Sequence, residues 1–240
     1  MIVILTGAGI SRESGLPTFR GVDGLWEKAR IEEVATSSAL RRDPARVYRF
    51  CNAMRAAILS PGVAPNPAHY ALARLQAEAA GEVVLVTQNI DDLHERAGSE
   101  EVLHMHGEGL KARCRRCGFV LCWEKDLFGS EDCPECKARK ALRPHIVLFD
   151  EEPLYMGEIR RALDLCGLFV SIGTSGSVYP AAGFVSLVRA RGVRTLELNL
   201  EPSLNRGAFS EAFYGPASEI VPKFVNRVLS GKHAPNSGKV

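Results

Sequence analysis

The sequence lacks the features that mark several specialised classes of protein. Its apolar runs are far shorter than the roughly 18 residues of a membrane-spanning helix, and strand-like sequence begins at Ile2 with no basic leader or cleavage site before it. Neither sign of charge dominates, because 30 Lys and Arg face 28 Asp and Glu for a net charge of +2. Internal repeats and low-complexity tracts are also missing. We therefore expect a cytoplasmic protein that binds neither nucleic acid nor a membrane.

Aromatic residues make up only 7% of the chain. Hydrophobic residues make up 46% of it, which is enough to form a folded core in a chain of 240 residues. Four short, β-branched runs are each followed by loop-forming residues: Ile2–Thr6, Val83–Thr87, Leu168–Gly173 and Thr195–Leu200. Helices begin between them at Asp43-Pro44 and Asn66-Pro67, where an N-cap residue precedes a first-turn proline. This alternation predicts an α/β protein with a doubly wound, Rossmann-like parallel sheet.

The seven cysteines are an odd number in a chain without an export signal, which argues against a disulfide framework. Four of them form two Cys-x-x-Cys pairs separated by 15 residues, a spacing typical of a tetrahedral zinc site: Cys114, Cys117, Cys133 and Cys136. Four thiolates leave no open coordination position, so we expect one zinc ion with a structural role. The alternative is unligated or redox-active thiols. We interpret Cys122 as a bystander and Cys166 as a core residue.

The region around these cysteines differs in composition from the rest of the chain. Residues 108–142 carry few aliphatic side chains and could not fold by hydrophobic burial alone, so they are interpreted as an inserted zinc module. Residues 1–107 and 143–230 then form the Rossmann-like domain, while a helical part near 30–65 joins the smaller domain. Residues 231–240 are expected to be a disordered tail, and we favour a monomer.

Several polar or glycine-rich segments follow the predicted strands, where parallel sheets place their ligands. The first, Gly7-Ala8-Gly9-Ile10-Ser11, would let the backbone approach a phosphate. It lacks the third glycine of the dinucleotide fingerprint, so a purely structural turn is the alternative. The other segments comprise Gln88, Asn89, Ile90 and Asp91, then Gly173, Thr174 and Ser175, and finally Asn199, Leu200 and Glu201. Their amide, hydroxyl and carboxylate groups suit a nucleotide, although such residues also cap loops and helices.

Two histidines flank a methionine in His104-Met105-His106-Gly107, just before the zinc module. An imidazole titrates near neutral pH and serves well as a general base, which makes this segment a candidate for catalysis. A structural role is the alternative, and it is the commoner one for a single histidine.

Taken in order, these motifs resemble the sirtuin family of NAD-dependent protein lysine deacylases, from Ile4 to about Val228. Gly15-Leu16-Pro17-Thr18-Phe19-Arg20 belongs to the same pattern, and Gly24-Leu25-Trp26 is similar to the bacterial branch that also contains desuccinylases. The resemblance implies that NAD binds the strand-end segments above, with further contacts from Phe19, Arg20, Trp26 and Ala217. His106 would be the general base and Asn89 the second catalytic residue.

The resemblance also implies acyl-lysine proteins as substrates. The substrate segment would bind as an added strand beside Val147, Phe149 and Val178. In desuccinylases of this family a Tyr-x-x-Arg binds the acyl carboxylate, and its equivalents here are Cys51 and Met54, neither of which can pair with a carboxylate. We therefore expect acetyl-lysine to be preferred over succinyl-lysine.

Alternatives to this interpretation stay open. Cys51 and Met54 could simply pack their helix against the core, while Arg55 could rotate toward the acyl group and support desuccinylation or demalonylation. Asp150, where the family usually has glycine, could alter the loop or attract basic residues that flank the target lysine. Mono-ADP-ribosyl transfer and a non-catalytic NAD or ADP-ribose sensor are alternative functions. A zinc-ribbon nucleic-acid binder fits the near-neutral charge poorly.

Overall fold

The computed structural model describes residues 1–18 and 30–231. The predicted NAD contacts of Phe19, Arg20 and Trp26, and the predicted tail from residue 232 onward, lie outside the described residues. Within these two ranges, no helix is both long enough and apolar enough to cross a membrane.

Six parallel strands form the main sheet, in the order β3-β2-β1-β7-β8-β9. Their bounds are β1 Ile2–Thr6, β2 Val83–Thr87, β3 Val102–His104, β7 Leu168–Ile172, β8 Arg194–Asn199 and β9 Glu211–Tyr214. The four apolar runs of the sequence are the four central strands, and the two outer strands are short. Because strand order reverses at β1, the carboxyl ends of β1, β2 and β7 surround the topological switch point, where such sheets bind ligands.

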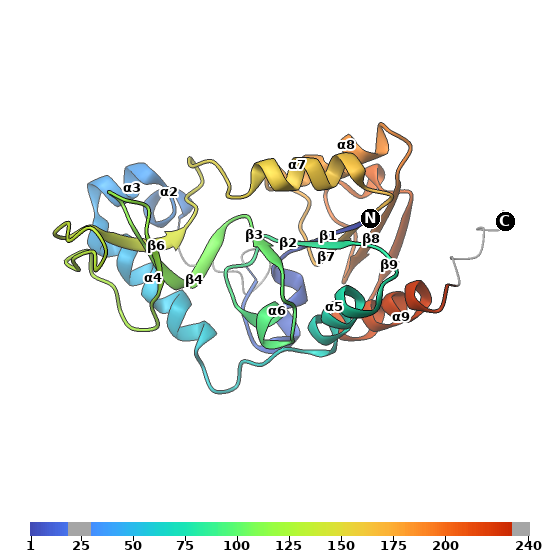
Figure 1. Ribbon diagram of the computed structural model, residues 1–240, viewed down its shortest axis with the longest axis horizontal. Helices are drawn as coiled ribbons and strands as arrows, with labels where there is room; N and C mark the ends of the chain where they lie inside the picture. Colours follow the sequence, from blue (N-terminus) through green and yellow to red (C-terminus); the bar gives the residue numbers. More distant parts are fainter. Residues whose placement is uncertain (19–29, 232–240) are drawn as a thin grey trace.

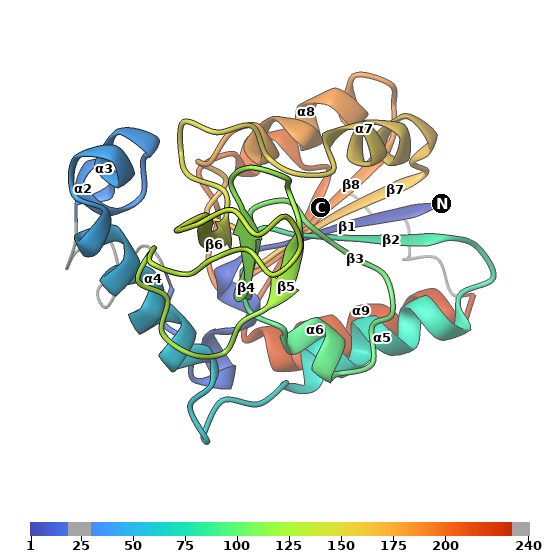
Figure 2. The same cartoon turned by 60° about the vertical axis from the view of Figure 1, so that its left-hand side comes forward.

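Helices cover both faces of this sheet (Figures 1 and 2). On one face, α7 and α8 pack over Val3 and Leu5, and on the other α5 and α9 pack over Ile4. The alternation along β1 buries both sides of the strand, as expected for a parallel sheet between two helical layers. This confirms the predicted doubly wound α/β fold. The helices of this part are α5 Pro67–Glu78, α6 Leu93–Arg96, α7 Met156–Leu165, α8 Phe184–Arg189 and α9 Ala217–Leu229, with short 3₁₀ turns at Ala8–Ile10, Arg12–Ser14, Ala181–Gly183 and Arg206–Ala208.

A second, three-stranded antiparallel sheet lies beside the first, in the order β5-β4-β6. Its strands are β4 Gly107–Cys114, β5 Val120–Cys122 and β6 Leu142–Ile146, and it lies with the helices α2 Ile31–Val34, α3 Ser37–Arg42 and α4 Pro44–Ile58 (Figure 2). Asp43 caps α4 by accepting a hydrogen bond from the Arg46 amide, and Asn66 forms a capping box with His69 on α5. Both predicted helix starts are therefore confirmed.

The chain passes from the large sheet to the small one at Gly107, directly after His106. Gly107 has φ 81, and a Cβ atom at this position would lie 2.1 Å from the carbonyl oxygen of His145 on β6. Only glycine allows this left-handed turn and this close approach together. The turn therefore places the start of β4 against β6 immediately beside His106.

We expect Gly107→Ala to destabilise the fold much more than Gly192→Ala. Gly192 also has a positive φ, of 77, but a Cβ atom there meets nothing within 4 Å. The control variant therefore tests the backbone conformation alone, at a cost of about 1–2 kcal/mol and a fall in melting temperature of about 2–4 °C per kcal/mol. The added clash should at least double that fall for Gly107→Ala in calorimetry. Equal melting temperatures for the two variants would contradict this account.

Candidate active site and metal centre

Two glycine-containing loops meet backbone to backbone above the switch point. The Gly9 amide donates to the Gly173 carbonyl oxygen at 2.9 Å, and the Gly7 amide donates to the Ile172 oxygen at 3.0 Å. A Cβ atom on Gly9 would lie 2.7 Å from the Gly173 Cα, and Gly173 itself has φ 64. Side chains at these positions would separate the loops that follow β1 and β7, so the glycines set the shape of this part of the site.

The Ser11 hydroxyl links three other polar side chains from different parts of the fold. It donates to Asp91 Oδ2 at 3.0 Å and accepts from Asn89 Nδ2 at 3.1 Å, and His69 Nε2 lies 3.5 Å away. His69 Nδ1 accepts from the Asn66 amide, so its proton is on Nε2, facing Ser11. Burial lowers the pKa of His69 to about 4, which keeps the ring neutral. Sequence reasoning missed His69, although its position three residues after the Asn66 cap was a usable signal.

Asp91 is 6% exposed, and burial raises its pKa to about 6 even though it accepts hydrogen bonds from Ser11 and the Leu93 amide. Its charge is therefore sensitive to nearby cations. Thr6, Thr87 and His94 form a second buried polar cluster. Thr6 Oγ1 donates to Thr87 Oγ1 at 2.8 Å and lies 3.0 Å from His94 Nε2. These side chains join the ends of β1 and β2 to α6.

His106 lies at the rim of this polar cluster. Its Nδ1 is 3.0 Å from the Gln88 carbonyl oxygen. A carbonyl only accepts, so Nδ1 carries the proton and Nε2 is left with the lone pair. Burial lowers the pKa of His106 despite this hydrogen bond, which favours the neutral ring at pH 7. A neutral, oriented imidazole of this kind is suited to accept a proton.

The ends of β7 and β8 complete the polar rim of the site. Thr174 Oγ1 lies 2.9 Å from Ser171 Oγ, and Asn199 donates to the Thr174 carbonyl at 2.9 Å. Leu200 and Glu201 are exposed beyond β8, and Ala217 begins α9. An unexpected contact is that Glu13 accepts from the backbone amide and hydroxyl of Ser218, which ties the first glycine-rich loop to the start of α9.

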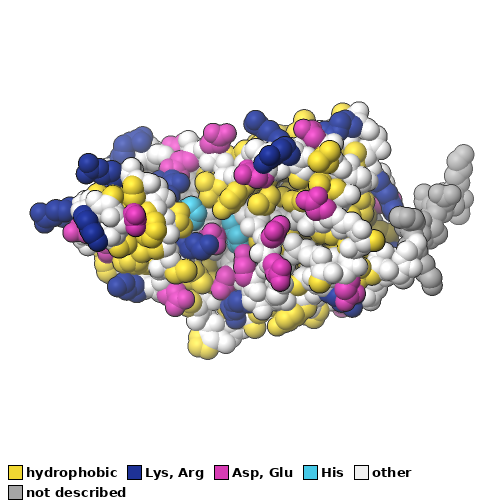
Figure 3. All heavy atoms as spheres, in the orientation of Figure 1, with side chains coloured by type: hydrophobic (Ala, Val, Ile, Leu, Met, Phe, Trp, Pro, Cys, Tyr) yellow, Lys and Arg dark blue, Asp and Glu magenta, His cyan; other side chains and the backbone are white. Residues whose placement is uncertain are grey.

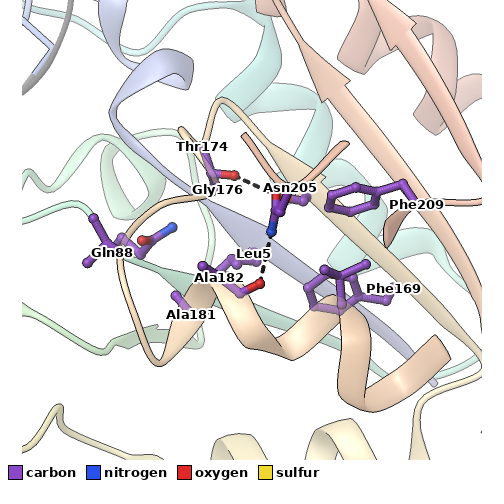
Figure 4. A pocket seen from close by; sticks show the side chains of 12 residues that line it. Leu5, Gln88, Phe169, Thr174, Gly176, Ala181, Ala182, Asn205 and Phe209 are labelled. Atoms are coloured by element: carbon purple, nitrogen blue, oxygen red, sulfur yellow. Dashed lines mark hydrogen bonds between the residues drawn. The ribbon is translucent and has the colours of Figure 1, made fainter. Parts of the chain in front are cut away.

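The hydrophobic side chains predicted to bind substrate also lie close to these strand ends. Cys51 and Met54 on α4 belong to one cluster with Ile146 and Ile90, so they border the segment between Asn89 and Asp91. Val147 donates its amide to the His106 carbonyl at 2.9 Å. Phe149 is half-exposed, and Val178 lines a small hollow beside Gln88 and Asn205, in which the Asn205 amide donates to the Ala182 carbonyl (Figure 4).

Arg55 and Asp150 are engaged away from the Cys51–Met54 cluster. The buried Arg55 guanidinium donates to the Gly109 carbonyl at 3.0 Å, to Asn52 Oδ1 at 2.8 Å and to the Lys125 carbonyl at 3.3 Å. It thus fastens α4 to the small sheet and its following loop. Asp150 Oδ1 accepts from the amide and the hydroxyl of Ser37, contacts that hold its pKa below the usual value. This carboxylate joins the substrate-side loop to α3.

The four cysteines of the two Cys-x-x-Cys pairs converge on one point, with all four Sγ atoms within 4.8 Å of one another. Cys114 and Cys136 Sγ are 3.7 Å apart, and Cys117 and Cys133 Sγ are 3.8 Å apart. Four sulfurs around zinc at 2.3 Å lie roughly 3.8 Å from one another in a regular tetrahedron. The donor set and its geometry therefore fit one structural zinc ion. Cys122 lies outside the group, and Cys166 is buried in the core, both as interpreted from the sequence.

Known proteins share this fold and much of this sequence. The Sir2 family model matches residues 7–180. The NAD-dependent protein deacylase SIR2rp3 of Trypanosoma brucei brucei (strain 927/4 GUTat10.1) is 56% identical over 97% of this chain and 96% of its own length. The NAD-dependent protein deacylase of Escherichia coli (strain K12) is 52% identical over 97% and 84%. A solved complex of a Sir2 homologue with NAD superposes with a TM-score of 0.84 at 35% identity, over 97% of this chain and 90% of the other.

The match to the family model and the high identity over nearly the whole chain place this protein in the Sir2 family. The resemblance drawn from the ordered sequence motifs is confirmed.

We expect one zinc ion per chain, lost on Cys133→Ala and retained on Cys122→Ala. Cys133 is buried within the four-sulfur group, whereas Cys122 is exposed and outside it. Loss of the ion should lower the melting temperature, because the small core beside it cannot compensate for a missing metal. Elemental analysis with calorimetry measures both effects. Full zinc occupancy in Cys133→Ala would overturn the assignment.

Proposed function

We propose that the protein is an NAD-dependent protein lysine deacylase that prefers acetyl-lysine to succinyl-lysine. The observation that carries the deacylase part of this proposal is the geometry of His106. Its neutral imidazole is fixed through Nδ1 by the carbonyl of Gln88, the residue before Asn89, and this leaves Nε2 as the basic nitrogen. The NAD-dependent deacylase names of the relatives and the NAD-bound homologue support the deacylase activity.

NAD would be held by the segments that meet at the switch point. The Gly7–Ser11 loop suits the pyrophosphate, because Gly7 and Gly9 have no side chains and allow close approach to the backbone. Gly173, Thr174, Ser175 and Asn199 suit the adenosine half, and Asn89 and Asp91 suit the nicotinamide and its ribose. When bound, NAD supplies the ribose carbon that takes up the acyl oxygen as nicotinamide leaves.

The residues of the chain then have separate tasks. His106 Nε2 accepts the proton of a ribose hydroxyl, which makes that oxygen nucleophilic toward the acyl carbon, and general-base catalysis of this kind contributes about 10²–10⁴-fold. Ser11 orients both Asn89 and Asp91. Water would then complete the release of free lysine, and the acyl group would leave on ADP-ribose. The zinc ion would only stabilise the fold of the small domain, because four thiolates leave it no open coordination position.

An apolar acyl site follows from the residues around Cys51 and Met54. They pack with Ile146 and Ile90, and burial raises the pKa of Cys51 to about 12, so its thiol stays neutral. A carboxylate buried against these side chains would lose its hydration without gaining a partner, which is costly. Arg55 donates to Gly109, Asn52 and Lys125 through Nε and Nη1, while its buried Nη2 has no hydrogen-bond partner among the described residues. We propose that these three bonds hold the guanidinium away from the acyl group.

The protein partner would be an extended acyl-lysine segment, bound as an added strand between Val147–Phe149 and Val178. The half-exposed Phe149 and the contact of the Val147 amide with the His106 carbonyl support this placement, because they bring this segment to the candidate base. We further propose a cytoplasmic monomer that binds no nucleic acid. Mono-ADP-ribosyl transfer and a non-catalytic sensor predict different products, so the following experiment separates them.

We expect His106→Asn to lower kcat for deacetylation at least 100-fold while NAD still binds. Asparagine keeps a donor for the Gln88 carbonyl but has no basic nitrogen, so the loss reports proton transfer alone. Mass spectrometry of an acetyl-lysine peptide and of the nucleotide products measures the reaction, and calorimetric titration measures binding. If the wild-type protein yields ADP-ribosylated protein and no free lysine, transferase activity replaces the proposal. If it binds NAD and yields neither product, it is a sensor.

The acyl preference gives a second expectation. Wild-type protein should remove acetyl at least tenfold faster than succinyl from matched peptides, a difference of about 1.4 kcal/mol. Cys51→Tyr combined with Met54→Arg should shift that ratio toward succinyl by supplying a charge-assisted partner for its carboxylate.

Arg55→Ala is the matched control, because it removes a cation on the same helix that lies outside the cluster. It should leave the succinyl-to-acetyl ratio unchanged, a quantity that loss of folded protein does not alter. A lower ratio in Arg55→Ala would assign carboxylate binding to Arg55 instead.

A further inference from the structure

His104 is a buried histidine that the proposed chemistry does not use. It ends β3 and is 3% exposed. Its Nδ1 lies 3.1 Å from the carbonyl oxygen of Asn89, and its Nε2 lies 2.7 Å from Glu95 Oε1 on α6. One ring therefore joins three separate segments: β3, the loop after β2, and the helix that follows it.

These contacts define how the ring is protonated. The Asn89 carbonyl has no proton to donate, so Nδ1 must carry one. An ionised Glu95 carboxylate is likewise only an acceptor, so Nε2 must carry the second proton, and the ring is an imidazolium. Burial alone would lower the pKa of His104, but the hydrogen bond and charge of Glu95 outweigh it and raise the pKa. The other described histidines differ, since burial lowers the pKa of His69, His94, His106 and His145.

The titratable groups that interact with this ring come from several elements: Glu95 and His94 on α6, Asp91 after β2, and Glu108 on β4. The two glutamates favour the imidazolium, and the imidazolium in turn lowers the pKa of Asp91 and of His94. Figure 3 shows acidic side chains gathered over the middle of the face where Figure 1 places β3 and α6. A buried cation is therefore stabilised at this point.

His104 affects two residues that are assigned to the nicotinamide end of NAD, Asn89 and Asp91. His104 holds the main chain of Asn89 directly through the carbonyl, while the side chain of Asn89 reaches Ser11 and the Gly7 carbonyl. The charge of His104 also lowers the pKa of Asp91, whereas burial raises it. Because that pKa is about 6, a further rise would protonate part of Asp91 near neutral pH. Neither Asn89 nor Asp91 has another side-chain cation within hydrogen-bonding distance among the described residues.

We propose that the Glu95–His104 ion pair is a positioning element of the NAD site, which fixes the Asn89 backbone and holds a positive charge beside Asp91. The inference rests on the proposed function, because it assigns Asn89 and Asp91 to the nicotinamide end of NAD. His104 acts through these two residues and does not itself touch the reacting atoms.

Glu95→Gln separates the charge from the hydrogen bonds. The glutamine amide can donate to Nε2 of a neutral ring whose Nδ1 proton still binds the Asn89 carbonyl, so both contacts survive and the cation is lost. Glu95 has a side chain 39% exposed, which makes an isosteric change there compatible with folding. Glu100→Gln, an exposed carboxylate between α6 and β3, is the matched control for loss of one negative charge.

The expected result is a shift in the pH dependence of NAD binding and turnover. Without the imidazolium the pKa of Asp91 rises, so more of it is protonated at pH 6–7. The acid limb of kcat/KM for NAD should then move to higher pH by about one unit, so the value should fall about threefold at pH 6.5 and about tenfold at pH 5. The deficit should vanish above pH 8, where Asp91 is ionised in both proteins, and Glu100→Gln should match the wild type throughout.

Nitrogen-15 NMR of the histidine rings provides a readout that does not depend on activity. His104 should be doubly protonated at pH 7 in the wild type and neutral in Glu95→Gln. A neutral His104 in the wild type would overturn the inference and leave deacylation standing. An unchanged pH profile in Glu95→Gln, with or without a lower melting temperature, would reduce the pair to a structural contact. An imidazolium in a wild-type chain that neither binds NAD nor deacylates peptides would overturn the proposed function and this role together.

Discussion

The site depends on how the carbonyl groups at the end of β2 are satisfied. A parallel strand that stops at a ligand site leaves backbone acceptors without strand partners, and unpaired acceptors in a buried place are costly. Here the Gln88 and Asn89 carbonyls each accept from an imidazole, of His106 and His104 respectively. β3 ends at His104 and the turn that follows it carries His106, so one segment beside β2 supplies both rings. The same contacts place a proton on Nδ1 of each ring, so the carbonyl groups at the end of β2 determine which nitrogen of His106 is left to accept a proton.

The two histidines differ because of what faces their second nitrogen. His104 meets a carboxylate of α6 and is held as a cation, whereas His106 has no carboxylate among the groups that shift its pKa and is held neutral by burial. Two histidines that are two residues apart therefore differ in protonation, and their proposed roles, a fixed charge and a proton acceptor, follow from this difference. Environment assigns the role, as is general for titratable groups at functional sites.

The second sheet extends from the same segment. After His106 the chain turns at Gly107 into β4, which carries the first Cys-x-x-Cys pair at its far end. Arg55 joins α4 to this sheet by donating to the Gly109 carbonyl. This hydrogen bond helps to fix Cys51 and Met54, which lie on the same helix, relative to His106. In the proposed function, a zinc ion bound by these cysteines would contribute indirectly, because it would stabilise the sheet to which α4 is fastened.

Much of this protein could be read from local sequence. The apolar runs predicted β1, β2, β7 and β8, and the cysteine spacing predicted the four-sulfur group, because each pattern reports a constraint that acts over a few neighbouring residues. The glycine-rich loops were recognisable for the same reason, and the ordered motifs identified the family before any geometry was known.

Only the tertiary structure decided which groups meet across long separations. The edge strands β3 and β9 have no periodicity strong enough to predict, since three or four partly polar residues become strands by pairing with a neighbour. His69 reaches Ser11 across 58 residues, Arg55 reaches Gly109 across 54, and Glu13 reaches Ser218 across 205. Local sequence therefore determined the strands, the metal ligands and the candidate base. The protonation states, the engagement of Arg55 and the neighbours of Asp91 depend on burial and distance, which arise only when the chain is folded.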